Sequence, residues 1–320
     1  MKRIAITLLW AATAFATEPV KPDAKAPARP AEAKPADAKP AEAKPAGKAP
    51  AVAYKEGLAT PESVFYDEKN DEYLVSNVNG SPLAKDNNGY LAVLSPEGKV
   101  LNPRFIAGGQ NGVTLNAPKG TALLNDVLYV ADIDTVRMFD RKTGKPKGEI
   151  AVPGGTFVND LFAYEGKVYV TDSGLKQGAK DFEPSEADAV YAIEKGKLVT
   201  LVKAKDLGHP NGVFANKAGV WVVNFGNDEL WQLDVKGKKK GAVTRLPKGS
   251  LDGIFEVDGE LYVSSWAGSA VYKGKPGGEF TEVLGGQAAP ADIGYDPKRK
   301  RVLIPHFMDN TVEAYELAAK

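Results

Sequence analysis

Apolar segments of four or five residues, rich in β-branched and aromatic side chains, recur along most of the chain. Six of them share one pattern that ends in a small or polar residue: residues 72–76, 128–132, 168–172, 220–224, 261–265 and 302–306. Dipeptides that favour turns, such as Glu-Gly, Thr-Gly and Asp-Gly, lie between such segments. Short strands bounded by turn signals predict an all-β chain.

A shorter motif precedes each of these six segments. An apolar residue or proline is followed by one variable position, then by a small or acidic residue and, in most copies, a β-former. The variable positions are Glu62, Lys119, Asn159, Asn211, Asp252 and Ala291, and successive copies lie 57, 40, 52, 41 and 39 residues apart. Units of about 40 residues with several short strands are typical of β-propeller blades. Six copies therefore predict a six-bladed β-propeller over residues 54–320.

The sixth unit offers only three strand patterns, at residues 292–296, 301–306 and 311–317. An unpaired edge in a closed ring would expose a row of backbone donors and acceptors. Residues 52–58, just before the first unit, have the composition of a strand. We therefore predict that this N-terminal segment supplies the fourth strand of the last blade.

Two units carry longer segments after their second strand, at residues 80–88 and 173–188. Long loops on a rigid scaffold often carry recognition, although a plain surface loop has the same signature. We expect both segments to lie at one rim of the ring.

The first 53 residues have a different composition. A basic start, an apolar run over residues 4–15 and an Ala-Phe-Ala site predict a signal peptide over residues 1–16. The apolar run is shorter than the ~20 residues of a membrane span, so a retained anchor is the weaker alternative. Residues 17–53 repeat Ala, Pro, Lys and acidic residues, which predicts a disordered linker. We expect a periplasmic or secreted protein whose linker is a solvated tether or contacts a cell-envelope partner.

The composition excludes several kinds of chemistry. Cysteine is absent, so disulfides, thiolate catalysis and zinc–thiolate sites are excluded. Basic and acidic residues balance at 41 each, which gives no indication of a nucleic-acid partner or of a membrane partner after signal cleavage. No G-x-S-x-G, Walker A or G-x-G-x-x-G motif occurs.

The inner strand of every propeller blade lines the axial channel, so equivalent positions of the six motifs should converge. Glu62, Asn159, Asn211 and Asp252 would then bring two carboxylates and two amide oxygens together, beside Lys119. Oxygen donors without sulfur or imidazole suit Ca²⁺, and suit Mg²⁺ or Mn²⁺ less well. The same side chains could instead cap turns and tie blades together through backbone hydrogen bonds.

These motifs resemble those of the six-bladed superfamily that contains the senescence marker protein (regucalcin)/gluconolactonase/luciferin-regenerating-enzyme family and, more distantly, paraoxonases and diisopropyl-fluorophosphatase. The resemblance spans about residues 54–317 and rests on a Glu in the first blade and on Val-Asn-Asp, Pro-Asn-Gly and Leu-Asp-Gly. It implies a catalytic divalent ion, usually Ca²⁺, in the central tunnel. The implied ligands are Glu62, Asn159, Asn211 and Asp252.

Two features depart from that family. Lys119 stands where relatives often carry an uncharged or imidazole side chain, and a cation beside Ca²⁺ is repulsive. Its ammonium could point into the substrate funnel, replace the metal by pairing with Glu62 and Asp252, or face away. Glu62 is followed by Ser63 rather than by the Gly-Pro common in gluconolactonases, which argues against the sugar-lactonase subgroup.

Residues just beyond the second strands should line the mouth of the tunnel. They are Asn79, Asp134, Phe225, Trp266 and His306, with His209 beside a ligand motif. Of these, His306, Trp266 and His209 are the candidate substrate-binding residues. An aromatic side chain at such a position can equally pack between blades.

Two functional hypotheses follow. The first is a metal-dependent hydrolase of a lactone or related ester, with a small-molecule substrate in the tunnel, Asp252 as base or nucleophile, and Lys119 or His306 orienting the substrate. The second is a non-catalytic propeller that binds a ligand or a protein partner, with its centre filled by a structural ion or a Lys119 salt bridge.

Overall fold

The computed structural model describes residues 48–179 and 181–317. The predicted signal peptide and all but the last six residues of the predicted linker lie outside the described residues, so both stay predictions. Every regular element of the described chain is a β-strand. Consequently these residues contain no helix that is long and apolar enough to span a membrane.

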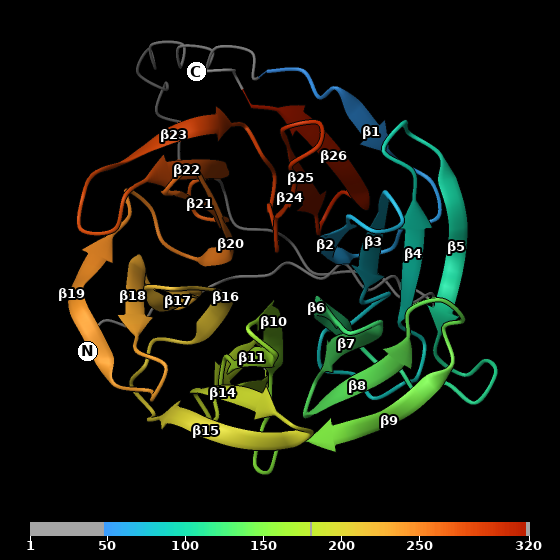
Figure 1. Cartoon of the computed structure of the whole chain (residues 1–320), viewed down its shortest axis with the longest axis horizontal. Coiled ribbons are helices and arrows are strands. Elements are labelled where there is room, and N and C mark those ends of the chain that lie inside the picture. Colours follow the sequence, from blue (N-terminus) through green and yellow to red (C-terminus); the bar gives the residue numbers. More distant parts are fainter. Residues whose placement is uncertain (1–47, 180, 318–320) are drawn as a thin grey trace, which may run out of the picture. The chain divides into compact units, whose positions relative to one another are not determined.

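Six four-stranded antiparallel sheets follow one another around a central axis (Figure 1). Blades 1 to 3 consist of β2 (Pro61–Asp67), β3 (Glu72–Asn77), β4 (Tyr90–Leu94) and β5 (Val100–Ala107); β6 (Pro118–Leu124), β7 (Val127–Asp132), β8 (Thr135–Asp140) and β9 (Pro146–Ala151); and β10 (Val158–Tyr164), β11 (Lys167–Asp172), β14 (Ala189–Glu194) and β15 (Lys197–Lys203). Blades 4 and 5 consist of β16 (Pro210–Asn216), β17 (Gly219–Asn224), β18 (Glu229–Leu233) and β19 (Lys239–Arg245); and β20 (Leu251–Val257), β21 (Glu260–Ser265), β22 (Ala270–Gly274) and β23 (Phe280–Gly285). The predicted six-bladed propeller is therefore confirmed.

Blade 6 is completed by the N-terminal segment. Its strand order is β1 (Val52–Tyr54), β26 (Thr311–Glu316), β25 (Arg301–His306) and β24 (Gly294–Asp296). Val52 pairs with Ala314, and Tyr54 pairs with Val312. The Tyr54 side chain is buried and its hydroxyl donates to the carbonyl oxygen of Ser95 in blade 1 over 2.5 Å. The predicted closure of the ring by residues 52–58 is thus confirmed, with a strand of three residues.

The inner strands of blades 1 to 5 bulge at their motifs. The pairing register shifts between Pro61 and Ser63 in β2 and between Pro118 and Thr121 in β6, and β10, β16 and β20 shift at the equivalent place. A bulge leaves the extra residues out of the ladder and re-aims their side chains. The variable positions are therefore released from the blade and turned toward the axis.

Neighbouring inner strands approach each other closely at these bulges. A Cβ atom on Gly253 would lie 2.2 Å from the backbone nitrogen of Ile293, and one on Gly120 would lie 2.4 Å from Oδ1 of Asp160. Such distances exclude any side chain without a shift of the backbone. The glycines of the motif therefore let the ring close tightly around its axis.

The last residue of each second strand fastens the loop that enters the inner strand of the same blade. Asn77 Oδ1 accepts a hydrogen bond from the Ala59 nitrogen, and Asp172 Oδ1 accepts one from the Phe157 nitrogen. The equivalent side chains in the other blades contact the equivalent loop: Asp132 with Ala117, Asn224 with Leu207, Ser265 with Gly249 and His306 with Ala288. One polar side chain per blade thus fixes the loop that leads into the inner strand and its motif.

The segment at residues 173–188 contains a small hairpin of β12 (Leu175–Gln177) and β13 (Phe182–Pro184). Phe182 packs edge-on against Phe157, with ring centres 6.0 Å apart, and Thr156 and Ser185 share a hydrogen bond of 2.6 Å. The segment is therefore a structured flap over the entry to the inner strand of blade 3.

Candidate functional site

The candidate ligands are almost completely buried at the bulges of β2, β10, β16 and β20. The exposed fraction is 7% for Glu62, 4% for Asn159, and 3% for Asn211 and Asp252. Lys119, at the bulge of β6, has no exposed surface. These positions occupy equivalent places on five inner strands, and the inner strands surround one axis (Figure 1).

Contacts between blades show which of these side chains meet. Asp252 and Lys119, from blades 5 and 2, both act electrostatically on the carboxyl group of Glu62 in blade 1. The side-chain amide of Asn211 lies beside Asp252 and lowers the pKa of its carboxyl group through hydrogen bonding. Asn159 Nδ2 donates to Ser173 Oγ over 3.0 Å, and that hydroxyl donates to the carbonyl oxygen next to Asn211 over 2.7 Å.

Three buried oxygens of this centre lack a hydrogen-bond partner among the described residues. They are Oε2 of Glu62, Oδ1 of Asn211 and Oδ1 of Asp252. A buried acceptor without a partner carries the full cost of desolvation, about 1–3 kcal/mol and more if it is charged. Three such acceptors from three blades fit an arrangement that presents oxygen to a cation.

The acidic side chains of the centre resist ionisation. Burial raises the pKa of Glu62 well above its usual value, and the charges of Asp252 and Asp292 act in the same direction. Burial and Asp292 likewise raise the pKa of Asp252, while the Trp266 indole and the Asn211 amide counteract them. A dry cluster of like charges favours protons or a bound cation.

Lys119 does not neutralise these carboxylates by direct pairing. Its ammonium donates to the carbonyl oxygen of Ala117 over 3.1 Å and lies 4.6 Å from the centre of the Phe157 ring. Burial lowers its pKa, and the more distant charges of Glu62 and other acids raise it. Of the three orientations considered for Lys119, pairing with Glu62 and Asp252 is not found in the described residues, where every ion pair within 4.0 Å involves other side chains.

Two further carboxyl groups were missed at the sequence level because they follow the variable position. Asp160 Oδ2 accepts from the Val213 nitrogen over 2.7 Å, and Asp292 Oδ2 accepts from Ser63 Oγ over 2.6 Å. Burial and the neighbouring Asp292 raise the pKa of Asp160, and burial raises that of Asp292 to about 7. A signal was present: this column of the motif holds glycine in three blades and aspartate in two.

Aromatic side chains stand beside Asp252. Trp266 Nε1 donates to Asp252 Oδ2 over 2.8 Å. Its indole contacts the rings of Phe225 and Phe307, with centres 5.5 Å away in each case. Trp266 therefore packs between blades, which is one of the two alternatives considered for it, and it also orients a candidate ligand; its contact with substrate stays a prediction.

The two histidines have different surroundings. His209 Nδ1 lies 2.7 Å from the Ser173 carbonyl oxygen and 3.3 Å from Asp188 Oδ1. Burial disfavours the charged form of His209, but Asp188 and the Ser173 carbonyl group together outweigh burial, and the pKa of His209 is raised. His306 instead contacts Ala288 and Glu313 within its own region of the ring, and no described contact joins it to the four candidate ligands.

Asn79 and Asp134 hold the longer loop of blade 1. Asn79 Nδ2 donates to the Asn88 carbonyl oxygen over 3.0 Å, and Asp134 forms an ion pair of 2.6 Å with Lys85. Both side chains therefore have structural partners at the rim.

The side-chain oxygens of the four candidate ligands are the type of donor atom that a hard cation prefers. The residues from 48 to 179 and 181 to 317 contain no group of three or more His, Cys, Asp or Glu side chains arranged to hold a metal. Two of the four candidate ligands are asparagines, which such a group does not include. The unpartnered oxygens of Glu62, Asn211 and Asp252 are the observation that supports a cation here.

No protein-family model and no curated protein matches this chain. Among solved structures, a gluconolactonase from Xanthomonas campestris superposes with a TM-score of 0.58 at 16% identity, covering 81% of this chain and 87% of the other. This chain has the propeller fold of gluconolactonases. A structural-genomics candidate gluconolactonase gives a TM-score of 0.57 at 17% identity, covering 82% of this chain and 92% of the other.

The same fold also occurs in a protein complex. A chain of the nidogen/laminin complex gives a TM-score of 0.52 at 16% identity, covering 67% of this chain and 74% of the other. The superfamily resemblance inferred from the motifs is thus confirmed for the fold. At these identities the likeness does not select a function, because one fold hosts many.

Proposed function

We propose that the chain is a metal-dependent hydrolase of a lactone or related ester, with a Ca²⁺-type ion held by Glu62, Asn159, Asn211 and Asp252. The observation that carries the proposal is the set of three buried, unpartnered acceptor oxygens contributed by three separate blades. Two carboxylates would balance the charge of one divalent ion, and an all-oxygen set favours Ca²⁺ over Mg²⁺ or Mn²⁺.

When bound, such an ion would polarise a substrate carbonyl and stabilise negative charge on its oxygen. Asp252 is the candidate base or nucleophile. Its Oδ2 is fixed by the Trp266 indole, whereas its Oδ1 has no hydrogen-bond partner among the described residues. One fixed and one free oxygen would orient the carboxyl group while leaving an atom to accept a proton.

Lys119 would act from a distance. Its charge lowers the pKa of Glu62 against the effects of burial and of the neighbouring acids. It would therefore help to keep Glu62 ionised. The flap that carries Phe182 packs on Phe157, which in turn covers the ammonium of Lys119 and shields it from water.

His209 and Trp266 remain candidate substrate contacts. The Trp266 indole, with Phe225 and Phe307, would give the substrate an apolar wall next to Asp252. Since Nδ1 of His209 is engaged by Ser173 and Asp188, its Nε2 would be the atom available to a substrate. The contacts of His306 within blade 6 favour a structural role, so we assign it no substrate contact.

A non-catalytic propeller is the second candidate, and one observation favours it. The ligand positions are at most 7% exposed, and none of them lines either of two clefts, of about 150 and 350 Å³, that lie between blades 4 and 5 and between blades 2 and 3. A structural ion would need no open path for substrate. Since Lys119 forms no ion pair with Glu62 or Asp252, an ion suits this alternative better than a salt bridge does.

The expected partner of the enzyme is a small molecule at the tunnel, whereas the non-catalytic propeller would bind a ligand or a protein, including a cell-envelope partner through the linker. The balanced charge of the chain continues to argue against nucleic acid and membranes. An exported location depends on residues 1–16 and on the linker that follows.

Metal analysis of the purified chain tests the proposal. We expect about one divalent ion per chain, lost together with lactone or ester turnover in the Asn159→Ala, Asn211→Ala double variant. The exposed Asn102→Ala on β5 is the matched control and should retain both. An ion retained without turnover on a panel of lactones would support the structural alternative, and a metal-free, inactive wild-type chain would exclude the enzyme.

A further inference from the structure

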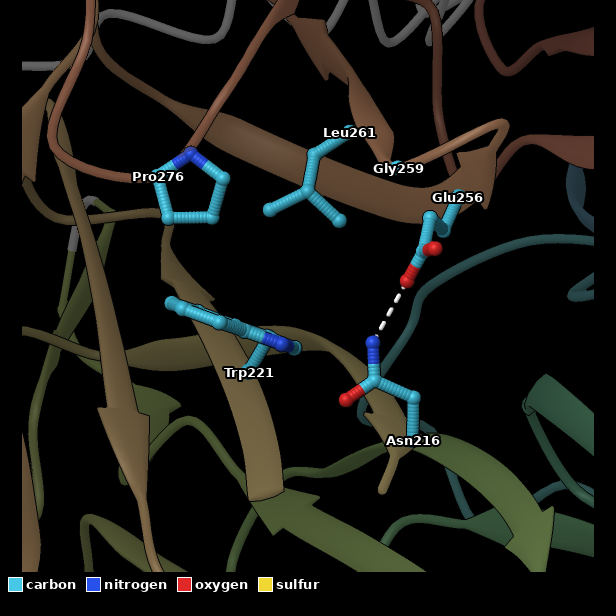
Figure 2. Close-up of a pocket in the computed structure, with 6 residues that line it drawn as sticks. All are labelled: Asn216, Trp221, Glu256, Gly259, Leu261 and Pro276. Atoms are coloured by element: carbon cyan, nitrogen blue, oxygen red, sulfur yellow. Dashed lines mark hydrogen bonds between the residues drawn. The ribbon is translucent and has the colours of Figure 1, made fainter. Parts of the chain in front are cut away.

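A separate pocket lies between blades 4 and 5, with a volume of about 150 Å³. Figure 2 shows its walls, which are formed by Asn216, Trp221, Glu256, Gly259, Leu261 and Pro276. β16 begins next to Asn211 and ends at Asn216, five residues later. At about 3.3 Å per residue, the pocket is about 16 Å from the candidate metal ligands, toward the other face of the ring.

One end of the pocket carries a negative charge that has no cationic partner. Glu256 accepts a hydrogen bond from Asn216 Nδ2, and Asn216 Oδ1 in turn accepts from the Ala218 nitrogen over 2.8 Å. No described Lys, Arg or His lies within ion-pair distance of Glu256; the nearby Lys240 donates to the Ala218 carbonyl oxygen instead. The carboxylate is therefore held in place but left uncompensated.

An aromatic side chain forms another wall. In Figure 2 the indole of Trp221 lies along one side, and Leu261 and Pro276 lie across the space from it. Nothing lies within 4 Å of the position that a Cβ atom on Gly259 would take, which leaves that side open. The face of an indole attracts cations, most strongly where water is excluded.

We propose that this pocket binds an organic cation, an alkylammonium or quaternary ammonium group, between Trp221 and Leu261, with Glu256 as its counter-ion. A cavity of this volume holds benzene in an apolar protein interior, so it has room for a compact head group. It is smaller than the ~300 Å³ at which sites for whole drug-sized ligands begin. A metal ion is a poorer fit, because Ca²⁺ needs six to eight oxygen ligands and only Asn216 and Glu256 among the lining residues have side-chain oxygens.

The cation can come from a free small molecule or from a side chain of another protein, and both present the same chemistry. Choline represents the first source, and a peptide carrying trimethyl-lysine represents the second. Binding of either probe supports the site, and the tighter of the two identifies the source.

Ligand-observed NMR on the full chain tests the site. We expect choline to bind and its neutral isostere 3,3-dimethyl-1-butanol to bind at least about threefold more weakly. Glu256→Gln should weaken choline about threefold or more, and Trp221→Leu about tenfold. Glu279→Gln, an exposed residue before β23 with the same change in charge, should leave choline binding unchanged.

Three results would overturn the proposal: no binding of either cation, equal affinity for choline and the neutral isostere, or unchanged choline affinity in Glu256→Gln. Glu256 is partly exposed, so its substitution keeps the test valid even if Trp221→Leu does not fold. The tunnel ligands take no part in this pocket, and the result is independent of the proposed hydrolase activity.

Discussion

The ammonium of Lys119 lies 4.6 Å from the centre of the Phe157 ring and donates to the carbonyl oxygen of Ala117 rather than to a carboxylate. A fully buried lysine without a direct counter-ion bears a large desolvation cost. The ring and the carbonyl oxygen offset part of that cost, and the negative centre around Glu62 offsets more at longer range. Lys119 is therefore a buried charge whose desolvation cost is offset without a direct ion pair.

Replacement of this lysine should leave the fold intact. Lys119→Met keeps much of the volume and removes a buried charge that has no ion pair, so we expect unfolding free energy to change by less than about 1.5 kcal/mol. Removal of the positive charge should also tighten binding of a divalent ion. Thermal melting and calcium titration measure the two effects. A loss of about 3 kcal/mol or more would mean that Lys119 pairs with a carboxylate after all.

The indole of Trp266 should control the affinity of the tunnel for cations. Trp266→Phe removes the donor to Asp252 Oδ2, which costs about 1.5–3 kcal/mol of stability if the carboxylate stays charged and buried. Loss of a group that orients a metal ligand typically lowers metal affinity about 10- to 100-fold. Phe225→Leu changes the same aromatic wall without touching Asp252 and is the control. Equal calcium affinity in both variants would contradict a positioning role for Trp266.

The N-terminal clasp should be required for the stability of the ring. A chain that begins at residue 60 lacks β1 and the buried Tyr54, whereas a chain that begins at residue 47 retains both. Loss of a buried aromatic side chain alone costs about 3–5 kcal/mol, and loss of β1 also exposes the edge of β26. Chemical denaturation of the two chains measures the difference. Identical unfolding curves would show that blade 6 does not depend on its fourth strand.

Low pH should weaken the ion pairs that Asp71 of blade 1 forms with Lys298 and Arg299 of blade 6. Hydrogen bonds from Arg299 and Lys298 hold the pKa of Asp71 well below its ordinary value of 3.8. A carboxyl group with a lowered pKa contributes stability above pH ~4, and this contribution is lost as the pH falls through the folded-state pKa. Asp71→Asn should therefore remove part of the loss of stability between pH ~4 and pH ~2. Asp206→Asn, at an exposed loop aspartate, should not alter that slope.

The repeat pattern of the sequence predicted some residues of the site correctly and missed others. The repeating position that begins with Glu62 located the axial side chains, because a bulge at the same place in the inner strands of blades 1 to 5 gives those copies the same direction. Asp292 was not predicted as part of the acidic centre, because the variable position next to it is Ala291, which has no polar side chain. His306 was assigned to the tunnel mouth, but it occupies the column that ties each entry loop, where other blades use Asn, Asp or Ser.

The sequence by itself determined the number of blades, the clasp within residues 52–58 and the equivalent positions of the oxygen donors on the inner strands. Strand patterns and the place of a residue within each repeat can be read along the chain, and a closed ring brings equivalent places of the repeats together. Only the tertiary structure decided what Lys119 contacts, that Asp160 and Asp292 join the acidic centre, and that Trp221 and Glu256 share a pocket. Those relationships depend on how neighbouring blades pack and exclude water. The spacing of residues along the chain does not predict this packing.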